Sequence, residues 1–233
     1  MINSFVALDI ETTGLNPAED KIIELGMAKV QDGSIVDSYS TLINPNIILD
    51  QRIIELTGIT QEMLAGKPVI ADIIQEVIDF IGDLPLLGHN IIFDYSFIKK
   101  AAVNNKLKFD KSGIDTLKIA RRLVPEAENR RLSYLCEYFS IDAGNSHRAY
   151  DDAISAMQLY YRMYGINPND TGFTELTELN YSVKKDTPIT PAQKKYLTAL
   201  VTLHNVELKE DIETLTKSRA SKLIDGIISE YGR

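Results

Sequence analysis

The chain has 233 residues, of which 44% are hydrophobic and 25% are charged, a composition typical of a folded globular protein. Its formal net charge of −8 excludes a protein that holds nucleic acid through a broad basic surface, because phosphate binding requires clustered Lys and Arg. No apolar stretch approaches the roughly 20 residues of a membrane helix, and the start lacks a secretory signal, so we expect a cytoplasmic protein that contacts no membrane.

Three β-rich segments open the chain, at residues 5–10, 22–30 and 35–43. An Asp-Gly pair at residues 32–33 separates the second segment from the third, which predicts a hairpin. The first segment is largely apolar, so we expect a central strand with both faces buried. A meander of three strands therefore begins the predicted fold.

Helical and β-type segments alternate through the middle of the chain. We expect helices at about 50–56, 60–65, 70–82, 92–104, 115–123, 131–139 and 149–164, and short strands at 85–88 and up to residue 114. A strand meander followed by such alternation predicts an α/β fold, with a mixed β-sheet that is flanked by helices.

The C-terminal part differs in composition. Residues 166–187 are polar and aperiodic, which is typical of a linker. Thr190, Pro191 and Gln193 then form a capping-box start of a helix, and Thr216 is a second candidate cap. We therefore expect a first domain, a linker and a small helical C-terminal domain, at residues 1–165, 166–187 and 188–233.

Asp9 and Glu11 stand two residues apart near the end of the first β-rich segment, so both side chains project from one face of a strand. Such pairs also occur on solvated strands. Here residues 5–8 are apolar, which makes a solvated strand the weaker interpretation. Two like charges this close require a cation, and the pair therefore indicates a metal site.

Asp94 falls in the first turn of the expected helix 92–104 and shares a face with Phe97, Ile98 and Ala101. A carboxylate on a buried face must be paired or must bind a metal. A helix N-terminal Asp that the helix dipole stabilises is an equally good interpretation of this residue taken alone.

His147 and Asp152 are five residues apart, a spacing that would point them in different directions on one helix. We therefore place His147 in the loop before the helix and Asp152 in its first turns. Asp152 shares a helical face with Ala149 and Ala153, whereas Asp151 does not, so helical phase selects Asp152. Four inward carboxylates and a loop histidine match a two-metal phosphodiesterase site.

The three motifs resemble those of DnaQ-like, DEDDh-type 3′-to-5′ exonucleases such as the proofreading epsilon subunit of DNA polymerase III. They are LDIETTGL at 8–15, GHNIIFD at 88–94 and HRAYDD at 147–152. The resemblance covers about residues 1–165 and implies a ribonuclease-H-like fold for this DEDDh exonuclease domain. It also implies two Mg²⁺ or Mn²⁺ ions and release of nucleoside 5′-monophosphates from single-stranded or frayed 3′ ends, with DNA favoured over RNA.

By motif position, the resemblance implies that Asp9, Glu11 and Asp152 hold the metal that binds the attacking water, and that Asp9 and Asp94 serve the second metal. His147 would be the general base, a role suited to a side chain that titrates near neutral pH. The residues expected to contact the terminal nucleotide are Thr12, Thr13, Leu15, Asn90 and Phe93, with Leu15 wedged against the last bases.

Thr57 stands where many members of the family have histidine, so the resemblance implies that one substrate contact is missing. Two alternatives stay open. The chain could be an RNA-trimming exonuclease of the same family, or a binding module that docks to a polymerase or helicase through its tail. The complete set of five candidate catalytic residues counts against a purely binding role.

Overall fold

The computed structural model describes residues 1–144, 147–208 and 210–232. The chain divides into two compact units. The larger unit comprises Met1–Pro45 and Asp50–Val183, and the smaller comprises Asn46–Leu49 and Lys184–Arg233. Each unit is described by itself.

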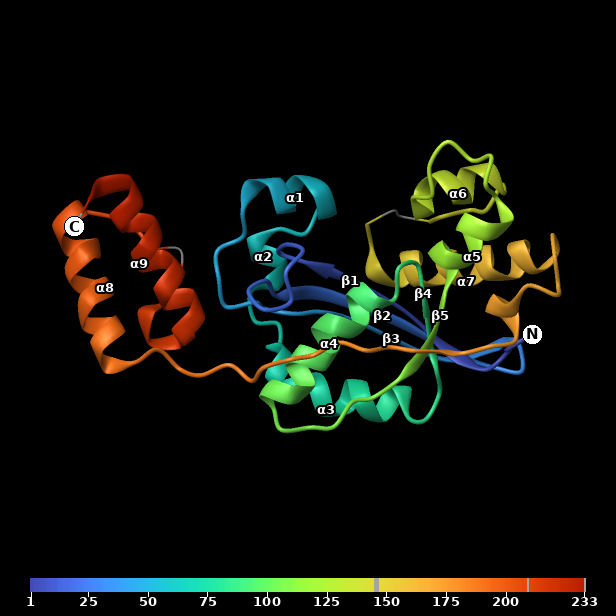
Figure 1. The fold of residues 1–233 in the computed structure, drawn as a ribbon, viewed down its shortest axis with the longest axis horizontal. Helices are drawn as coiled ribbons and strands as arrows, with labels where there is room; N and C mark the ends of the chain where they lie inside the picture. The colour runs from blue at the N-terminus through green and yellow to red at the C-terminus, as the bar shows by residue number, and fades with distance from the viewer. Residues whose placement is uncertain (145–146, 209, 233) are drawn as a thin grey trace. The chain divides into compact units, whose positions relative to one another are not determined.

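One mixed sheet forms the centre of the larger unit, with strand order β3-β2-β1-β4-β5-β6 (Figure 1). The strands are β1 (Phe5–Thr12), β2 (Ile22–Gln31), β3 (Ser34–Leu42), β4 (Leu86–Gly88), β5 (Ser112–Asp115) and β6 (Thr177–Glu178). Strand β1 pairs antiparallel with β2 and parallel with β4, so it lies inside the sheet. Residues Phe5, Val6, Ala7 and Leu8 have no exposed surface, and the predicted central strand is confirmed.

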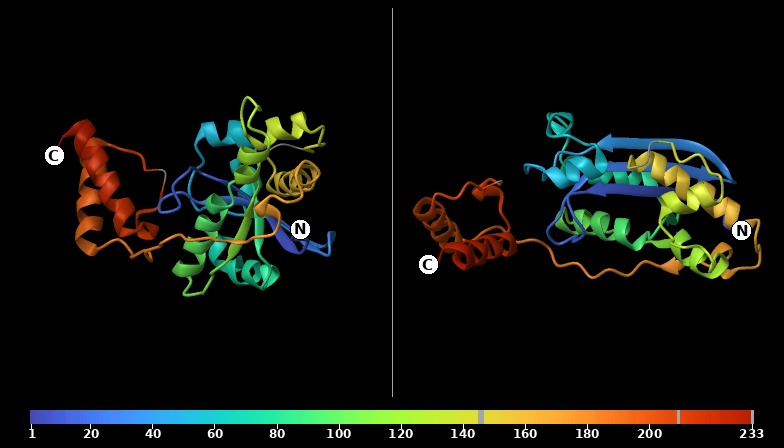
Figure 2. Two further views of the ribbon diagram at one scale, coloured as in Figure 1. Left: turned by 45° about the vertical axis from the view of Figure 1, so that its right-hand side comes forward. Right: turned by 90° about the horizontal axis from the view of Figure 1, so that it is seen from above.

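Helices cover both faces of this sheet (Figure 2). They are α1 (Gln51–Thr57), α2 (Gln61–Leu64), α3 (Ile70–Ile81), α4 (Ile92–Asn104), α5 (Thr116–Leu123), α6 (Leu132–Tyr138) and α7 (Ala149–Tyr164). Alternate residues of β1 divide between two cores: Phe5 and Ala7 pack with α5, α6 and α7, whereas Val6 and Leu8 pack with α3 and α4. The positions of all seven helices agree with the prediction.

Residues 166–183 lie in the larger unit, although their polar composition suggested a linker. A short 3₁₀ helix, η1 (Thr171–Phe173), precedes β6, which pairs antiparallel with β5. Phe173 is 0% exposed and belongs to the core with α5, α6 and α7, and Leu179 is 6% exposed and belongs to the core with α3 and α4. Two isolated apolar residues show no periodicity, so this packing carries no pattern that the sequence alone could reveal.

The smaller unit contains two helices, α8 (Pro191–His204) and α9 (Lys217–Tyr231), and a 3₁₀ turn, η2 (Ile212–Thr214). The predicted capping box is confirmed, because the Thr190 hydroxyl accepts a hydrogen bond from Gln193 N and the Gln193 side chain accepts one from Thr190 N. Its buried core consists of Leu197, Leu200, Leu215, Ala220, Ile224 and Ile227. Among the described residues of the chain, no helix is long and apolar enough to cross a membrane.

Candidate active site

A cleft with a volume of about 290 Å³ opens beside the C-terminal end of β1. It is lined by residues from β1, from the turn between β4 and α4, and from the first turns of α4, α6 and α7. All five candidate catalytic residues line it, together with two of the candidate substrate contacts: Asp9, Glu11, Asp94, His147, Asp152, Asn90 and Phe93.

Asp9 and Glu11 project from the face of β1 that packs against α7. In the antiparallel register with β2, Asp9 lies opposite Gly26 and Glu11 lies opposite Glu24. Opposed residues of two strands share a face, so Glu24 also points toward this side of the sheet. The strand therefore carries both cleft carboxylates toward the start of α7.

Asp94 reaches the cleft from the other layer, because α4 packs on the opposite face of the sheet. Strand β4 pairs with β1 only at Val6 and Ala7, which leaves the N–H of Ile10 without a partner in the sheet. The Asp94 Oδ1 atom accepts this hydrogen bond at 3.1 Å. The carboxylate is 3% exposed and so is fixed beside the last residues of β1.

Helix α7 approaches the sheet closely because β2 carries glycine at position 26. A Cβ atom at Gly26 would lie 2.1 Å from the backbone nitrogen of Tyr150 and 2.4 Å from the carbonyl carbon of Ala149. The buried Glu24 binds the same turn, since its Oε2 accepts a hydrogen bond from Ala149 N at 3.1 Å. These contacts bring the first turns of α7, and with them Asp152, to the carboxylates of β1.

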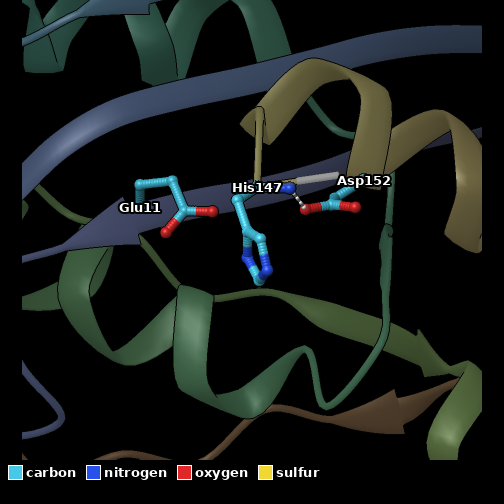
Figure 3. A group of neighbouring side chains, drawn as sticks. All are labelled: Glu11, His147 and Asp152. Atoms are coloured by element: carbon cyan, nitrogen blue, oxygen red, sulfur yellow. Dashed lines mark hydrogen bonds between the residues drawn. The ribbon is translucent and has the colours of Figure 1, made fainter. Parts of the chain in front are cut away.

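His147 lies just before α7, as expected, and has a left-handed backbone with φ of 67°. Its N–H donates a hydrogen bond to Asp152 Oδ2 at 3.1 Å, which ties the loop to the helix. Figure 3 shows the imidazole between the carboxylates of Glu11 and Asp152. Ligand atoms of these three residues all lie within 4.8 Å of one another, close enough to hold a single metal ion.

The cleft carboxylates repel one another. Burial raises the pKa of Asp9 well above its ordinary value, and the charges of Asp94 and Asp152 raise it further. Burial likewise raises the pKa of Asp94, and it raises the pKa of Glu11 to about 7 with help from Asp152 and Glu24. Burial raises the pKa of Asp152 too, although the His147 N–H opposes this shift.

Two of the candidate substrate contacts have defined positions in the cleft wall. Asn90 has a left-handed backbone with φ of 72°, and its N–H donates to Asp115 Oδ1 at 3.1 Å. The Phe93 ring packs on Phe97 with a centroid distance of 5.0 Å. These interactions hold Asn90 and Phe93 in the cleft wall at the start of α4.

Three further candidate contacts lie at the last residue of β1 and in the loop after it, outside the described lining of the cleft. The Thr12 hydroxyl donates to Gly14 O at 2.6 Å, and the Thr13 hydroxyl accepts from Lys21 N at 2.9 Å. Leu15 is 84% exposed, which leaves its side chain free to meet a ligand. Their substrate contacts therefore stay predictions.

Thr57 does not offer its hydroxyl to a ligand. Its side chain is buried, donates to Ile53 O at 2.9 Å and accepts from Ile59 N at 3.2 Å. The hydroxyl thus closes the end of α1, where Gly58 adopts a left-handed conformation.

Sequence reasoning missed the residues that support the site. Glu24 and Gly26 stand within an apolar run, and a polar residue and a glycine inside such a run are the signal that could have revealed them. The ring nitrogens of His89 contact Thr116 Oγ1 at 2.9 Å and Arg130 O at 2.6 Å, so this histidine orders the turn beside Asn90.

Comparison with known proteins gives both sequence relatives and structural neighbours. The DNA polymerase III PolC-type protein of Caldanaerobacter subterraneus subsp. tengcongensis is 32% identical over an alignment of 238 residues, which covers 96% of this chain and 17% of that relative. E. coli Exonuclease I in complex with a dA16 oligonucleotide is 20% identical with a TM-score of 0.64, over 74% of this chain and 42% of that one. The nuclease domain of 3′hExo, a DEDDh family member bound to rAMP, is 22% identical with a TM-score of 0.61, over 78% of this chain and 98% of that one.

The chain spans between 11% and 17% of the length of the PolC-type relatives. The structural neighbours confirm the predicted ribonuclease-H-like fold, with its six-stranded mixed sheet and flanking helices. The model of the RNase_T exonuclease family matches residues 6–160, which include all three motifs. A DEDDh family member is among the structural neighbours, and the chain belongs to the RNase_T exonuclease family, so the predicted membership of an exonuclease family is confirmed.

Proposed function

We propose that the chain removes nucleotides from the 3′ ends of single-stranded or frayed DNA with the help of two Mg²⁺ or Mn²⁺ ions. The observation that carries the proposal is the convergence of four carboxylates and one histidine in a single cleft. These residues are Asp9, Glu11, Asp94, Asp152 and His147.

The carboxylate cluster fits divalent cations. In the part of the chain that the structure describes, no Lys or Arg forms an ion pair with Asp9, Glu11, Asp94 or Asp152, so their charge is not balanced within the protein. An all-oxygen donor set suits Mg²⁺ or Mn²⁺. When bound, the ions supply positive charge that stabilises the attacking and leaving oxygens of phosphodiester hydrolysis.

Each side chain has a separate task in this proposal. Asp9, Glu11 and Asp152 would hold the ion that activates the attacking water, and Asp9 and Asp94 would hold the ion that stabilises the leaving 3′ oxygen. The imidazole of His147 accepts the proton of the attacking water at a ring nitrogen. The backbone N–H of His147 donates to Asp152 Oδ2, which ties the backbone that carries the imidazole to the start of α7.

DNA is the favoured substrate because of two comparisons. The sequence relatives are named as DNA polymerase III of the PolC type, and the E. coli Exonuclease I neighbour was solved with a dA16 oligonucleotide. RNA is the alternative, and the rAMP bound to the 3′hExo neighbour is the observation in its favour.

The test is digestion of matched 5′-labelled DNA and RNA oligonucleotides with Mg²⁺, Mn²⁺ or EDTA. Asp152→Asn should lower the rate by about a hundredfold or more, because it removes a ligand of the metal. Asp151→Asn is the matched control, since Asp151 is adjacent in α7 and lies outside the described lining of the cleft.

A ladder that shortens from the 3′ end in the wild type and in Asp151→Asn, and is absent with EDTA, supports the proposal. Faster digestion of RNA than of DNA would select the RNA-trimming alternative. No ladder on either substrate, from a protein whose circular dichroism is that of a folded chain, would overturn the proposed activity.

We also propose that the chain works beside a DNA polymerase or a helicase, and that the smaller helical unit contacts this partner. The exposed apolar side chains of Leu203, at 68%, and Tyr231, at 50%, support a contact surface there. Leu203→Asp should weaken capture of the partner while the nuclease ladder is unchanged; equal capture would reject this role.

The cytoplasmic location and the domain limits at 165 and 188 stay predictions.

A further inference from the structure

We infer that Arg131 binds a phosphate of the substrate strand at the wall of the cleft formed by the start of α6. The inference rests on the proposed function and adds a specific cationic contact to it. Adjacent arginines such as Arg130 and Arg131 could touch substrate phosphates, although such pairs more often form a solvated helix edge. The structure separates the two residues.

Arg131 is the only Lys or Arg among the described residues that line the cleft. It is exposed, and within the described part of the chain its guanidinium forms no ion pair or hydrogen bond. Arg148, by contrast, is paired with Glu24. A cation that shares a cleft with four carboxylates and pairs with none of them is available to an anionic ligand.

The guanidinium of the neighbouring Arg130, by contrast, is hydrogen-bonded within the protein. Its guanidinium turns inward and donates to Val124 O at 3.0 Å and to Pro125 O at 2.5 Å. Its carbonyl oxygen contacts the ring of His89 at 2.6 Å. Arg130 therefore anchors the segment before α6.

Two further contacts fix the backbone from which Arg131 extends. The second ring nitrogen of His89 contacts Thr116 Oγ1 at 2.9 Å, which links the segment to the ends of β4 and β5. The N–H of Arg131 donates to the Asn129 side chain at 3.0 Å. These hydrogen bonds fix the backbone of Arg131, whereas its side chain is free to adjust to a ligand.

A phosphate is the ligand chemistry that this arrangement fits. A scissile phosphodiester must lie against the carboxylates and their metal ions, so a phosphate of the same strand comes within the cleft that Arg131 lines. The guanidinium offers forked N–H donors that match two phosphate oxygens, and such charge-assisted bonds are stronger than neutral ones. The contact is independent of the base, as digestion of any 3′ end requires.

Steady-state digestion of a 5′-labelled oligodeoxynucleotide by Arg131→Ala, Arg131→Lys and Arg162→Ala tests the inference. Arg162 is a matched control because it is exposed and lies in the last turn of α7, away from the cleft. Arg131→Ala should raise KM by about tenfold, the loss of one charge-assisted hydrogen bond. Arg131→Lys should raise it less, and Arg162→Ala should leave it unchanged.

The salt dependence gives a readout that a structural defect would not change. Loss of one phosphate contact to a single strand should reduce the slope of log KM against log salt by about 0.7. An unchanged slope, or a fall in kcat and melting temperature with the slope retained, would overturn the inference. A wild-type protein that yields no ladder would instead reject the proposed function itself.

A second experiment locates the phosphate. The substrates are a series of oligodeoxynucleotides, each with one neutral methylphosphonate, and the modified position moves stepwise away from the 3′ end across the series. At one position the wild type should bind about tenfold more weakly, whereas Arg131→Ala should show no further loss there. Equal sensitivity of the wild type and Arg131→Ala at every position would contradict a direct contact.

Discussion

The buried carboxylate of Glu24 accepts two hydrogen bonds from the Arg148 guanidinium, from Nε at 2.9 Å and from Nη2 at 2.8 Å. The same side chain accepts the N–H of Ala149, the first residue of α7. Because Glu24 lies opposite Glu11 in the sheet, the residue that fixes α7 also adds negative charge beside a cleft carboxylate. Support of the site and its electrostatic repulsion therefore come from one side chain.

Arg148→Ala should lower the free energy of unfolding by about 1–2 kcal/mol, because it leaves the buried carboxylate of Glu24 without its cationic partner. This cost is lower than that of breaking a fully buried ion pair, because the Arg148 side chain is half-exposed and solvent screens its charge. Urea denaturation measures the change. Arg162→Ala, an exposed arginine in the same helix, should stay within about 0.5 kcal/mol of the wild type. Equal effects of the two substitutions would show that the Glu24 contact adds nothing to stability.

Gly26→Ala should destabilise the protein by about 3 kcal/mol, at the upper end of the usual cost of overpacking. The added Cβ would lie 2.1 Å from the backbone of Tyr150, and backbone atoms cannot move aside as a flexible side chain can. Activity should fall with stability, since displacement of α7 carries Asp152 away from Asp9. Thermal melting and the nuclease ladder measure the two effects.

The control for this substitution is Gly226→Ala in α9, where an added Cβ meets nothing within 4 Å. Alanine is the better helix former, so this variant should gain about 0.5–1 kcal/mol. A Gly26→Ala protein as stable and as active as the wild type would contradict the close approach of α7 to the sheet.

Without metal, the protein should lose stability as pH rises. The pKa of Glu11 is raised from its ordinary 4.5 to about 7, so between these values the folded chain keeps a proton that the unfolded chain has lost. The contribution of Glu11 to stability therefore falls through this window and levels off above it. Asp9, Asp94 and Asp152 have raised pKa values and act in the same direction.

Melting temperatures in EDTA, measured from about pH 5 to about pH 8, check this dependence. Glu11→Gln should flatten the fall, because a neutral amide binds no proton in either state. Millimolar Mg²⁺ should raise the melting temperature most at the alkaline end, where the carboxylates are ionised and bind the ion only in the folded protein. A metal-free protein that grows more stable through this range would refute the repulsion.

The sequence was sufficient for the helices of the larger unit, for strands β1 to β5 and for the five candidate catalytic residues of the cleft. Apolar periodicity predicted the seven helices of the larger unit, because each must bury one face on the sheet. Helical phase separated Asp152 from Asp151, since only one of two adjacent residues can face the core. The catalytic roles of these residues stay predictions.

What the sequence could not give depends on contacts between distant segments. The hydrogen bond from Ile10 N to Asp94 joins opposite layers of the fold and exists because β4 is too short to cover β1. Glu24 is polar inside an apolar strand, and its partner Arg148 lies 124 residues later. The local sequence pattern does not indicate such pairs. For the same reason it could not show that Arg130 turns inward while the adjacent Arg131 lines the cleft.

Thr190→Ala should destabilise the smaller unit alone. The substitution removes the hydroxyl that accepts the Gln193 N–H at 3.2 Å, and loss of such a cap costs about 1 kcal/mol. Amide hydrogen exchange in α8 and α9 should then quicken by about fivefold, while exchange in α7 is unchanged. Thr198→Ala, which replaces an exposed threonine within α8, is the control and should leave exchange unchanged or slow it slightly, because alanine favours the helix. If α7 exchange quickened by the same factor as α8, the two units would unfold together and the smaller one would not be a separate domain.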